Sequence, residues 1–303
     1  AVTGDEDKPL LFGFPSPSAT GFPSVRIVTG GSIADYSLRE WPSSQGPTVS
    51  GDTVSVVWSI SGVEIRQETG LAFNPYTGRD DTTRISYTIT NNDGQSHGVG
   101  IRLMLDIQVG DNDGARFVVP DTGNTNQEQK YDAADMPPYF KSFESNTYAQ
   151  DSLKGMGILD GFGATRPDRF ALASWPGIVD SVWDYTVTPG AIMYDSAAAW
   201  WWEPVSLSPG ESRTLVTYYG LASTGGGTDW IDAPAVVDCP PRDFHVDLWI
   251  VNNTTTAYQD GRSKINLPAG LHLADGERMT VDVGDVAAEG GVGSVGWNLR
   301  ADG

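Results

Sequence analysis

The sequence predicts an all-β protein: a large antiparallel β-sandwich domain followed by a smaller β-sandwich. Between Val99 and Val109 every second residue is apolar, a period of two that is typical of a strand with one buried and one open face. The run Thr82–Asn91 alternates in the same way, and the residues from Asn91 to Gln95 suit a hairpin connection. The 36 glycines and 19 prolines agree with many short strands joined by turns.

The elements of the large domain follow an irregular N-terminal segment, residues 1–23. Its apolar triplet, Leu10-Leu11-Phe12, is expected to pack onto the body of the domain. Two short segments, 133–136 and 195–200, suit helical turns, and no amphipathic helix longer than two turns is predicted. The predicted strands are Ser24–Thr29, Thr53–Ile60, Val63–Thr69, Thr82–Asn91, Gly98–Val109, Arg116–Val119, Tyr139–Phe143, Arg169–Ser174, Ala197–Glu203 and Arg213–Gly220.

A glycine-rich connection at Ser223–Thr228 interrupts the strand pattern, and Pro240-Pro241 adds a rigid one. Four further strand-like runs follow, at His245–Val251, Ser263–Leu267, Met279–Val283 and Ser294–Arg300. Their spacing favours a small immunoglobulin-like sandwich. We therefore divide the chain into a large β-sandwich domain, residues 1–225, and an immunoglobulin-like domain with its linker, residues 226–303.

The charge balance excludes several classes of partner. The 303 residues contain 39 acidic and 19 basic side chains, a net charge of −20, so nucleic acid is not an expected partner. Both adaptation to salt and extracellular solubility account for such a surface.

Membrane insertion is not expected, because no run approaches the roughly 18 apolar residues of a spanning helix. Cys239 is the only cysteine, which excludes an internal disulfide.

Six sequence motifs are distinctive together: Tyr87–Asn91, Val99–Asp106, Gly110–Ala115, Asp180–Asp184, Pro209–Arg213 and Thr217–Gly220. They resemble a large β-domain of uncharacterised secreted and surface proteins of bacteria and archaea, and the resemblance covers residues 80–222 best. That domain is similar in architecture to the supersandwich of the galactose-mutarotase-like group, which is often met in carbohydrate-active proteins. The tail, from Asn266 to Trp297, looks like the immunoglobulin-like modules of surface proteins. The resemblance implies a fold and an extracellular or cell-surface location, and no catalytic residues.

The acidic turn after Val109 is a candidate calcium site. Asp106, Asp111, Asn112 and Asp113 offer several hard oxygen ligands within a short stretch of chain, and calcium takes six to eight oxygens. Asp121 and Glu128 would complete the shell if the following loop folded back. The alternative is an Asx turn, in which these side chains bond nearby backbone N–H groups.

The cluster Trp200-Trp201-Trp202-Glu203 is a candidate glycan site. An exposed indole stacks on the apolar face of a sugar ring, and a neighbouring carboxylate accepts hydrogen bonds from its hydroxyls. In a strand, Trp200 and Trp202 share one face and Trp201 lies on the other. The alternative is that these side chains fill the core between the sheets.

These features favour a secreted or cell-surface, non-enzymatic module that binds a glycan or a neighbouring surface protein. A structural subunit that self-assembles into an extracellular filament, sheath or surface layer is the second hypothesis. A glycan-processing enzyme, a lyase or epimerase, is the third. Conceivable carboxylate pairs for it are Glu203 with Asp195 and Glu64 with Glu68.

Overall fold

The computed structural model describes residues 8–14, 16, 20–74, 79–120, 123–145, 152–222, 227–232, 243–252, 256–288 and 291–301. The described chain consists almost entirely of antiparallel strands and turns, which confirms the predicted fold class. Nearly all described residues up to Ala222 form one compact unit, and those from Gly227 onward belong to a second. The predicted boundary between residues 225 and 226, and the residues Asp121 and Cys239, lie outside the described residues.

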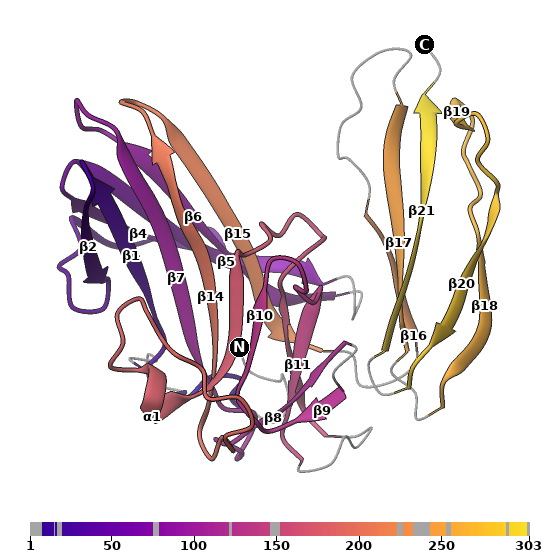
Figure 1. Ribbon diagram of the computed structural model, residues 1–303, viewed down its shortest axis with the longest axis horizontal. Coiled ribbons are helices and arrows are strands. Elements are labelled where there is room, and N and C mark those ends of the chain that lie inside the picture. Colours follow the sequence, from indigo (N-terminus) through magenta and orange to yellow (C-terminus); the bar gives the residue numbers. More distant parts are fainter. Residues whose placement is uncertain are drawn as a thin grey trace. The chain divides into compact units, whose positions relative to one another are not determined.

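Two antiparallel sheets build the first unit (Figure 1). The six-stranded sheet has the order β10 (Gln129–Asp132), β13 (Arg169–Ser174), β14 (Ser196–Leu207), β7 (His97–Ile107), β1 (Phe22–Thr29) and β2 (Ser32–Ser37). The nine-stranded sheet has the order β3 (Gln45–Ser50), β4 (Thr53–Ile60), β5 (Val63–Asn74), β6 (Arg79–Asn91), β15 (Ser212–Leu221), β12 (Lys154–Ile158), β11 (Tyr139–Phe143), β8 (Arg116–Val119) and β9 (Gly123–Thr125).

The main core lies between these two sheets. Leu103 and Leu105 of β7 share one hydrophobic cluster with Ile65 of β5 and Ile89 of β6, and all four side chains are buried. They belong to the apolar set that the period-two pattern assigns to one face of each strand. In Figure 1 the strands β1, β7 and β14 pass in front of β4 and β5. The alternation therefore predicted correctly which face of β7 meets the other sheet.

The outer face of β7 is buried as well, which the sequence pattern did not predict. Met104 belongs to a second cluster that includes Trp201 of β14 and Ile178 and Trp183 of the segment that follows β13. This segment contains the short helix α1 (Trp175–Ile178) and covers the outer face of the six-stranded sheet. The prediction of a half-buried strand is wrong here, because a connection far away in the sequence covers the face that the alternation leaves polar.

Residues 196–200 belong to strand β14 and Asp195 is a bend just before it, so this segment is not the helical turn suggested by its sequence. Three alanines at 197–199 have the highest intrinsic helix propensity. Their neighbours override it, because β14 lies between β13 and β7 and pairs with both. The small side chains of Ala197 and Ala199 share the outer cluster with Ile178 and Trp183, so the segment that follows β13 can pack closely on this face. In the part of the chain that the structure describes, no helix is long and apolar enough to cross a membrane.

The second unit contains two small antiparallel sheets. Four strands have the order β16 (Gly227–Asp232), β17 (Asp243–Asn252), β21 (Gly291–Ala301) and β19 (Leu271–Leu273), and β18 (Tyr258–Lys264) pairs with β20 (Thr280–Val286). Val246, Trp297 and Leu299 form its buried centre. The predicted strands at 245–251 and 294–300 lie within β17 and β21.

Candidate functional site

The three tryptophans of β14 are buried and present no stacking surface. Trp200, Trp201 and Trp202 are 0%, 2% and 0% exposed. Trp200 and Trp202 belong to the core between the sheets, whereas Trp201 belongs to the cluster on the outer face and donates from Nε1 to the Trp183 carbonyl oxygen at 2.9 Å. The prediction that an exposed indole stacks on a sugar here is wrong, because both faces of β14 are covered.

Glu203, the carboxylate beside these tryptophans, is partly exposed and forms an ion pair. Its Oε1 atom accepts a hydrogen bond from Arg169 Nε at 2.6 Å. The Arg169 guanidinium also lies over the Trp201 ring, 4.9 Å from its centroid. Glu203 therefore fixes an arginine that packs on the buried indole, a structural role that accounts for its position without a ligand.

The acidic turn contributes two carboxylates to a cluster whose third member comes from a distant strand. One ligand atom each of Asp106, Asp113 and Asp195 lies within 4.8 Å of the other two. Asp111 is not a member of this group. The Asn112 amide donates from Nδ2 to the Glu144 carbonyl oxygen at 2.9 Å, and Asp111 is exposed. The predicted set was therefore wrong for Asp111, which belongs to the same turn as Asp113 but lies outside the cluster.

Strand pairing places the three carboxylates. Asp106 is the penultimate residue of β7, on the outer face of its sheet, and Asp195 directly precedes β14. The register pairs Ser196 of β14 with Ile107 of β7, and the Ser196 N–H donates to the Asp113 carbonyl oxygen at 3.0 Å. Asp195 could have been identified as the third member of the cluster only from the pairing register between β7 and β14. The local sequence does not show this register.

Glu128 was proposed to complete the shell around the turn, and the structure gives it another role. Its carboxylate accepts hydrogen bonds from the Ser174 N–H at 2.8 Å, the Tyr185 hydroxyl at 2.6 Å and the Thr188 N–H at 2.7 Å. The side chain is buried and holds the ends of the segment over the six-stranded sheet. It is not a member of the three-carboxylate cluster.

Burial and mutual repulsion disfavour ionisation of the cluster. Burial, followed by the charges of Asp195 and Asp113, raises the pKa of Asp106 to about 7, against the opposing hydrogen bond from Thr20. Burial and the charge of Asp113 raise the pKa of Asp195 to about 6, and burial also raises the pKa of Asp113. Three carboxylates held together in this way are a costly arrangement unless protons or a cation neutralise them.

This electrostatic arrangement predicts a pH dependence in the presence of EDTA. The pKa of Asp106 in the folded protein, about 7, is above the ordinary value near 3.9, so between these values the folded state binds a proton that the unfolded chain has released. The stability of the wild type relative to Asp106→Asn should therefore fall as the pH rises from about 4.5 to 7. Urea unfolding of both proteins across this range measures the difference, and a constant difference would contradict the assignment.

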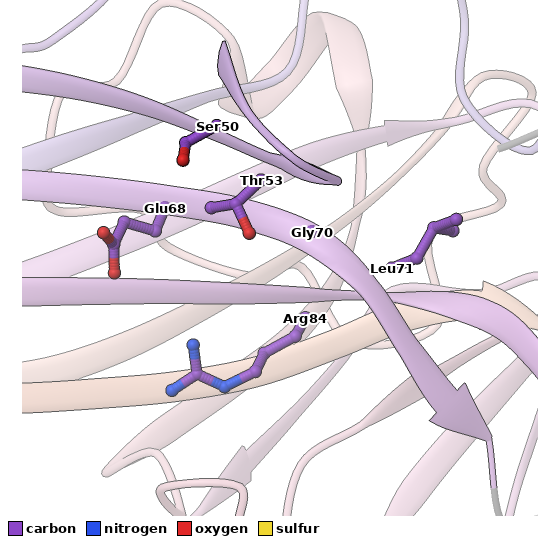
Figure 2. Close-up of a pocket in the computed structure, with 6 residues that line it drawn as sticks. All are labelled: Ser50, Thr53, Glu68, Gly70, Leu71 and Arg84. Carbon is purple, nitrogen blue, oxygen red and sulfur yellow. The ribbon is translucent and has the colours of Figure 1, made fainter. Parts of the chain in front are cut away.

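A second candidate site is a hollow of about 350 Å³ on the nine-stranded sheet. Figure 2 shows its lining side chains, which come from four neighbouring strands, β3 to β6. They are Ser50, Thr53, Glu68, Gly70, Leu71 and Arg84. Sequence reasoning noticed Glu68 only as half of a carboxylate pair and missed the hollow, since four strands must be paired before these residues meet.

Charged and hydroxyl groups line this hollow without neutralising one another. Arg84 donates from Nη1 to the Ser86 hydroxyl at 2.8 Å, and within the described residues neither Arg84 nor Glu68 forms a salt bridge. A Cβ atom at Gly70 would lie 3.0 Å from Thr53 Oγ1, so glycine keeps the floor of the hollow open beside this hydroxyl. The hollow thus combines an acceptor carboxylate, a donor guanidinium and two hydroxyls.

Comparison with known proteins finds similarity in structure alone. No family model and no curated protein matches the chain. A polysaccharide lyase is similar with 13% identity and a TM-score of 0.41, over 93% of this chain and 36% of the lyase. A galactose mutarotase-like protein from Lactobacillus casei is similar with 8% identity and a TM-score of 0.37, over 65% of this chain and 80% of that protein. A galactose mutarotase related enzyme from Lactobacillus acidophilus is similar with 7% identity and a TM-score of 0.35, over 66% and 78% of the two chains.

The chain spans about a third of the length of the polysaccharide lyase, 36%. At these identities and TM-scores, the likenesses carry no inference about what this chain binds. Its function has to be inferred from the residues of its own candidate sites.

Proposed function

We propose that this protein is a non-enzymatic module of an extracellular or cell-surface protein and binds a glycan in the hollow over β3 to β6. The observation that carries the proposal is the lining of the hollow, where Glu68 and Arg84 stand beside the hydroxyls of Ser50 and Thr53. Sugars present closely spaced hydroxyls, each both donor and acceptor. A carboxylate and a guanidinium recognise such groups through charge-assisted hydrogen bonds, which are stronger than neutral ones.

The composition of the lining favours binding over hydrolysis. Glycoside hydrolysis ordinarily needs two carboxyl groups on either side of the scissile bond. Glu68 is the single acidic residue among the six that line the hollow. Its predicted partner Glu64 lies 3.7 Å from Arg66, measured from Oε1 to Nη2, and is not among the lining residues. One carboxylate suits a residue that accepts hydrogen bonds from sugar hydroxyls.

The test is a screen of the purified chain on a glycan array, followed by calorimetric titration with the glycan it selects. Glu68→Gln and Arg84→Gln should each weaken binding by roughly 10- to 100-fold, since a charge-assisted hydrogen bond contributes about 1.5–3 kcal/mol. Glu64→Gln is the matched control, because it removes the same charge from the same strand outside the hollow. Unchanged affinity in both hollow variants would exclude this site.

Self-association through an outer strand is a second candidate, and β2 favours it. This strand is the end of the six-stranded sheet, and the side chain of Ile33 in it is 62% exposed. The outer strand β3 is less suitable, because Pro47 lacks an N–H and the register shifts between Gln45 and Thr48. Sedimentation at high concentration tests the idea: Ile33→Lys should reduce any assembly, and a wild type that stays monomeric would count against it.

A further inference from the structure

The Asp106, Asp113 and Asp195 cluster has a feature that an ordinary acidic patch lacks. Asp106 is only 3% exposed, yet its Oδ1 atom has no hydrogen-bond partner. The Oδ1 atoms of Asp113 and Asp195 are also buried and without a partner. Buried polar atoms are ordinarily hydrogen-bonded, so three orphaned carboxylate oxygens at one place require an explanation.

Side chains of the protein do not supply the missing positive charge. Within the described residues, neither lysine nor arginine forms a salt bridge with any of the three carboxylates, although such pairs occur elsewhere in the same unit, as between Arg26 and Asp35. The only side-chain hydrogen bond to Asp106 in the described part comes from the neutral Thr20. Burying charge without a partner is strongly unfavourable.

We propose that Asp106, Asp113 and Asp195 bind one Ca²⁺ ion. Calcium–oxygen distances of about 2.4 Å allow two ligand atoms on opposite sides of the ion to be at most about 4.8 Å apart. The ligand atoms of these three residues lie within 4.8 Å of one another, so every pair of them meets this limit. The cation is held by oxygen alone, which is the preference of hard cations and not of zinc or copper.

The three carboxylates of the cluster favour calcium over magnesium, which is usually bound through one or two carboxylates and keeps several waters. Asp113 and Asp195 are only partly buried, so water has access to the side of the ion away from Asp106. Three carboxylates with several waters satisfy the irregular shell of six to eight oxygens that calcium accepts, whereas magnesium demands near-ideal octahedral geometry and shorter distances. The site is small and partly open, which predicts the modest affinity of extracellular calcium modules, about 10⁻⁴–10⁻³ M.

Bound calcium would tie together segments that are far apart in the sequence. Asp106 is the penultimate residue of β7, Asp113 belongs to the turn that follows, and Asp195 directly precedes β14. The Asp195 carbonyl oxygen accepts a hydrogen bond from the Trp175 N–H, the first residue of α1, at 2.9 Å. The Trp175 indole donates to the Thr20 carbonyl oxygen at 3.3 Å. The ion would therefore stabilise the packing of α1 and the N-terminal segment on the outer face of the six-stranded sheet.

Thermal unfolding of the full chain with EDTA or with about 10–100 mM CaCl₂, a hundred times the predicted Kd, tests the site, with NaCl matching the ionic strength. Calcium at about a hundred times its Kd should raise the Tm of the wild type by roughly 5–10 °C. Asp195→Asn should abolish this rise while unfolding at a higher Tm than the wild type in EDTA, because one of three repelling charges is gone. The variant would then have the higher Tm in EDTA, and the wild type would gain stability from calcium while the variant would not. This pattern distinguishes loss of calcium binding from a failure to fold.

Asp111→Asn is the matched control, because it removes the same charge from the same turn outside the cluster and should retain the full calcium response. Terbium gives a second measurement: luminescence excited through the tryptophans should appear with the wild type and Asp111→Asn, be displaced by calcium, and be lost with Asp195→Asn. Equal Tm shifts in wild type and Asp195→Asn, or a response lost in Asp111→Asn, would overturn the proposal.

Discussion

Replacing Trp202 by alanine is expected to reduce the free energy of unfolding of the first unit by about 3–5 kcal/mol. The indole is fully buried between the two sheets, 6.5 Å from the Tyr87 ring measured between centroids. Its Nε1 atom donates to the Thr165 carbonyl oxygen at 2.7 Å. The substitution leaves a large cavity and removes the donor from a backbone carbonyl, and both effects reduce stability in the same direction.

Urea unfolding followed by circular dichroism measures this loss without relying on tryptophan fluorescence. Trp41→Ala is the control, because this indole is 38% exposed and contacts Tyr36 at the surface. Trp41→Ala should reduce the free energy of unfolding by well under half as much as Trp202→Ala. Equal effects of the two substitutions would show that Trp202 is not part of the core, and would reopen the interpretation of the tryptophan cluster as a ligand surface.

Replacing Arg102 by methionine is expected to destabilise the same unit by about 2–4 kcal/mol and to loosen the segment over the six-stranded sheet. Arg102 is fully buried, and burial lowers the pKa of its guanidinium to about 10. It donates from Nη1 to the Ser181 carbonyl oxygen and from Nη2 to the Ile178 carbonyl oxygen, the latter at 3.2 Å. Methionine replaces much of the apolar stem and removes the guanidinium that donates to the Ser181 carbonyl oxygen. The Ile178 carbonyl oxygen keeps the Ser181 N–H and hydroxyl as donors, at 3.1 and 2.8 Å.

Hydrogen exchange locates this effect, because the amides of residues 178–183 should exchange faster in Arg102→Met while those of β5 and β6 change less. Arg262→Met is the control, since its side chain is 72% exposed and lies in the second unit. An Arg102→Met protein with wild-type stability and unchanged exchange over α1 would show that the segment is held by its apolar contacts alone.

Local patterns predicted the strands well because alternation reports which residues share a face. The predicted strands at 53–60, 116–119, 139–143 and 169–174 coincide with β4, β8, β11 and β13. Short or polar strands such as β2 and β3 were not predicted from the sequence. Their strand conformation depends on pairing with β1 and β4, and their own composition does not indicate it. The same limit explains the wrong helical interpretation of residues 195–200.

The candidate sites divide in the same way. Asp106 and Asp113 were identified from one stretch of sequence, because a strand and the turn after it keep their residues close. Asp195 is brought to them only by the pairing of β14 with β7, and the hollow containing Glu68 and Arg84 only by the pairing of β3 to β6. The tryptophans at 200–202 were recognised as unusual, yet their sequence could not say whether one face would stay open.

The sequence by itself determined the all-β class, the positions of most long strands and the face of each that meets the opposite sheet. These properties depend on the period of apolar residues, which is local. Only the tertiary structure decided that the outer face of the six-stranded sheet is covered, that Trp201 is buried there, and that Asp195 joins Asp106 and Asp113. Each depends on which distant segments lie against a given face, and burial and charge at a point in space are set by all of them together.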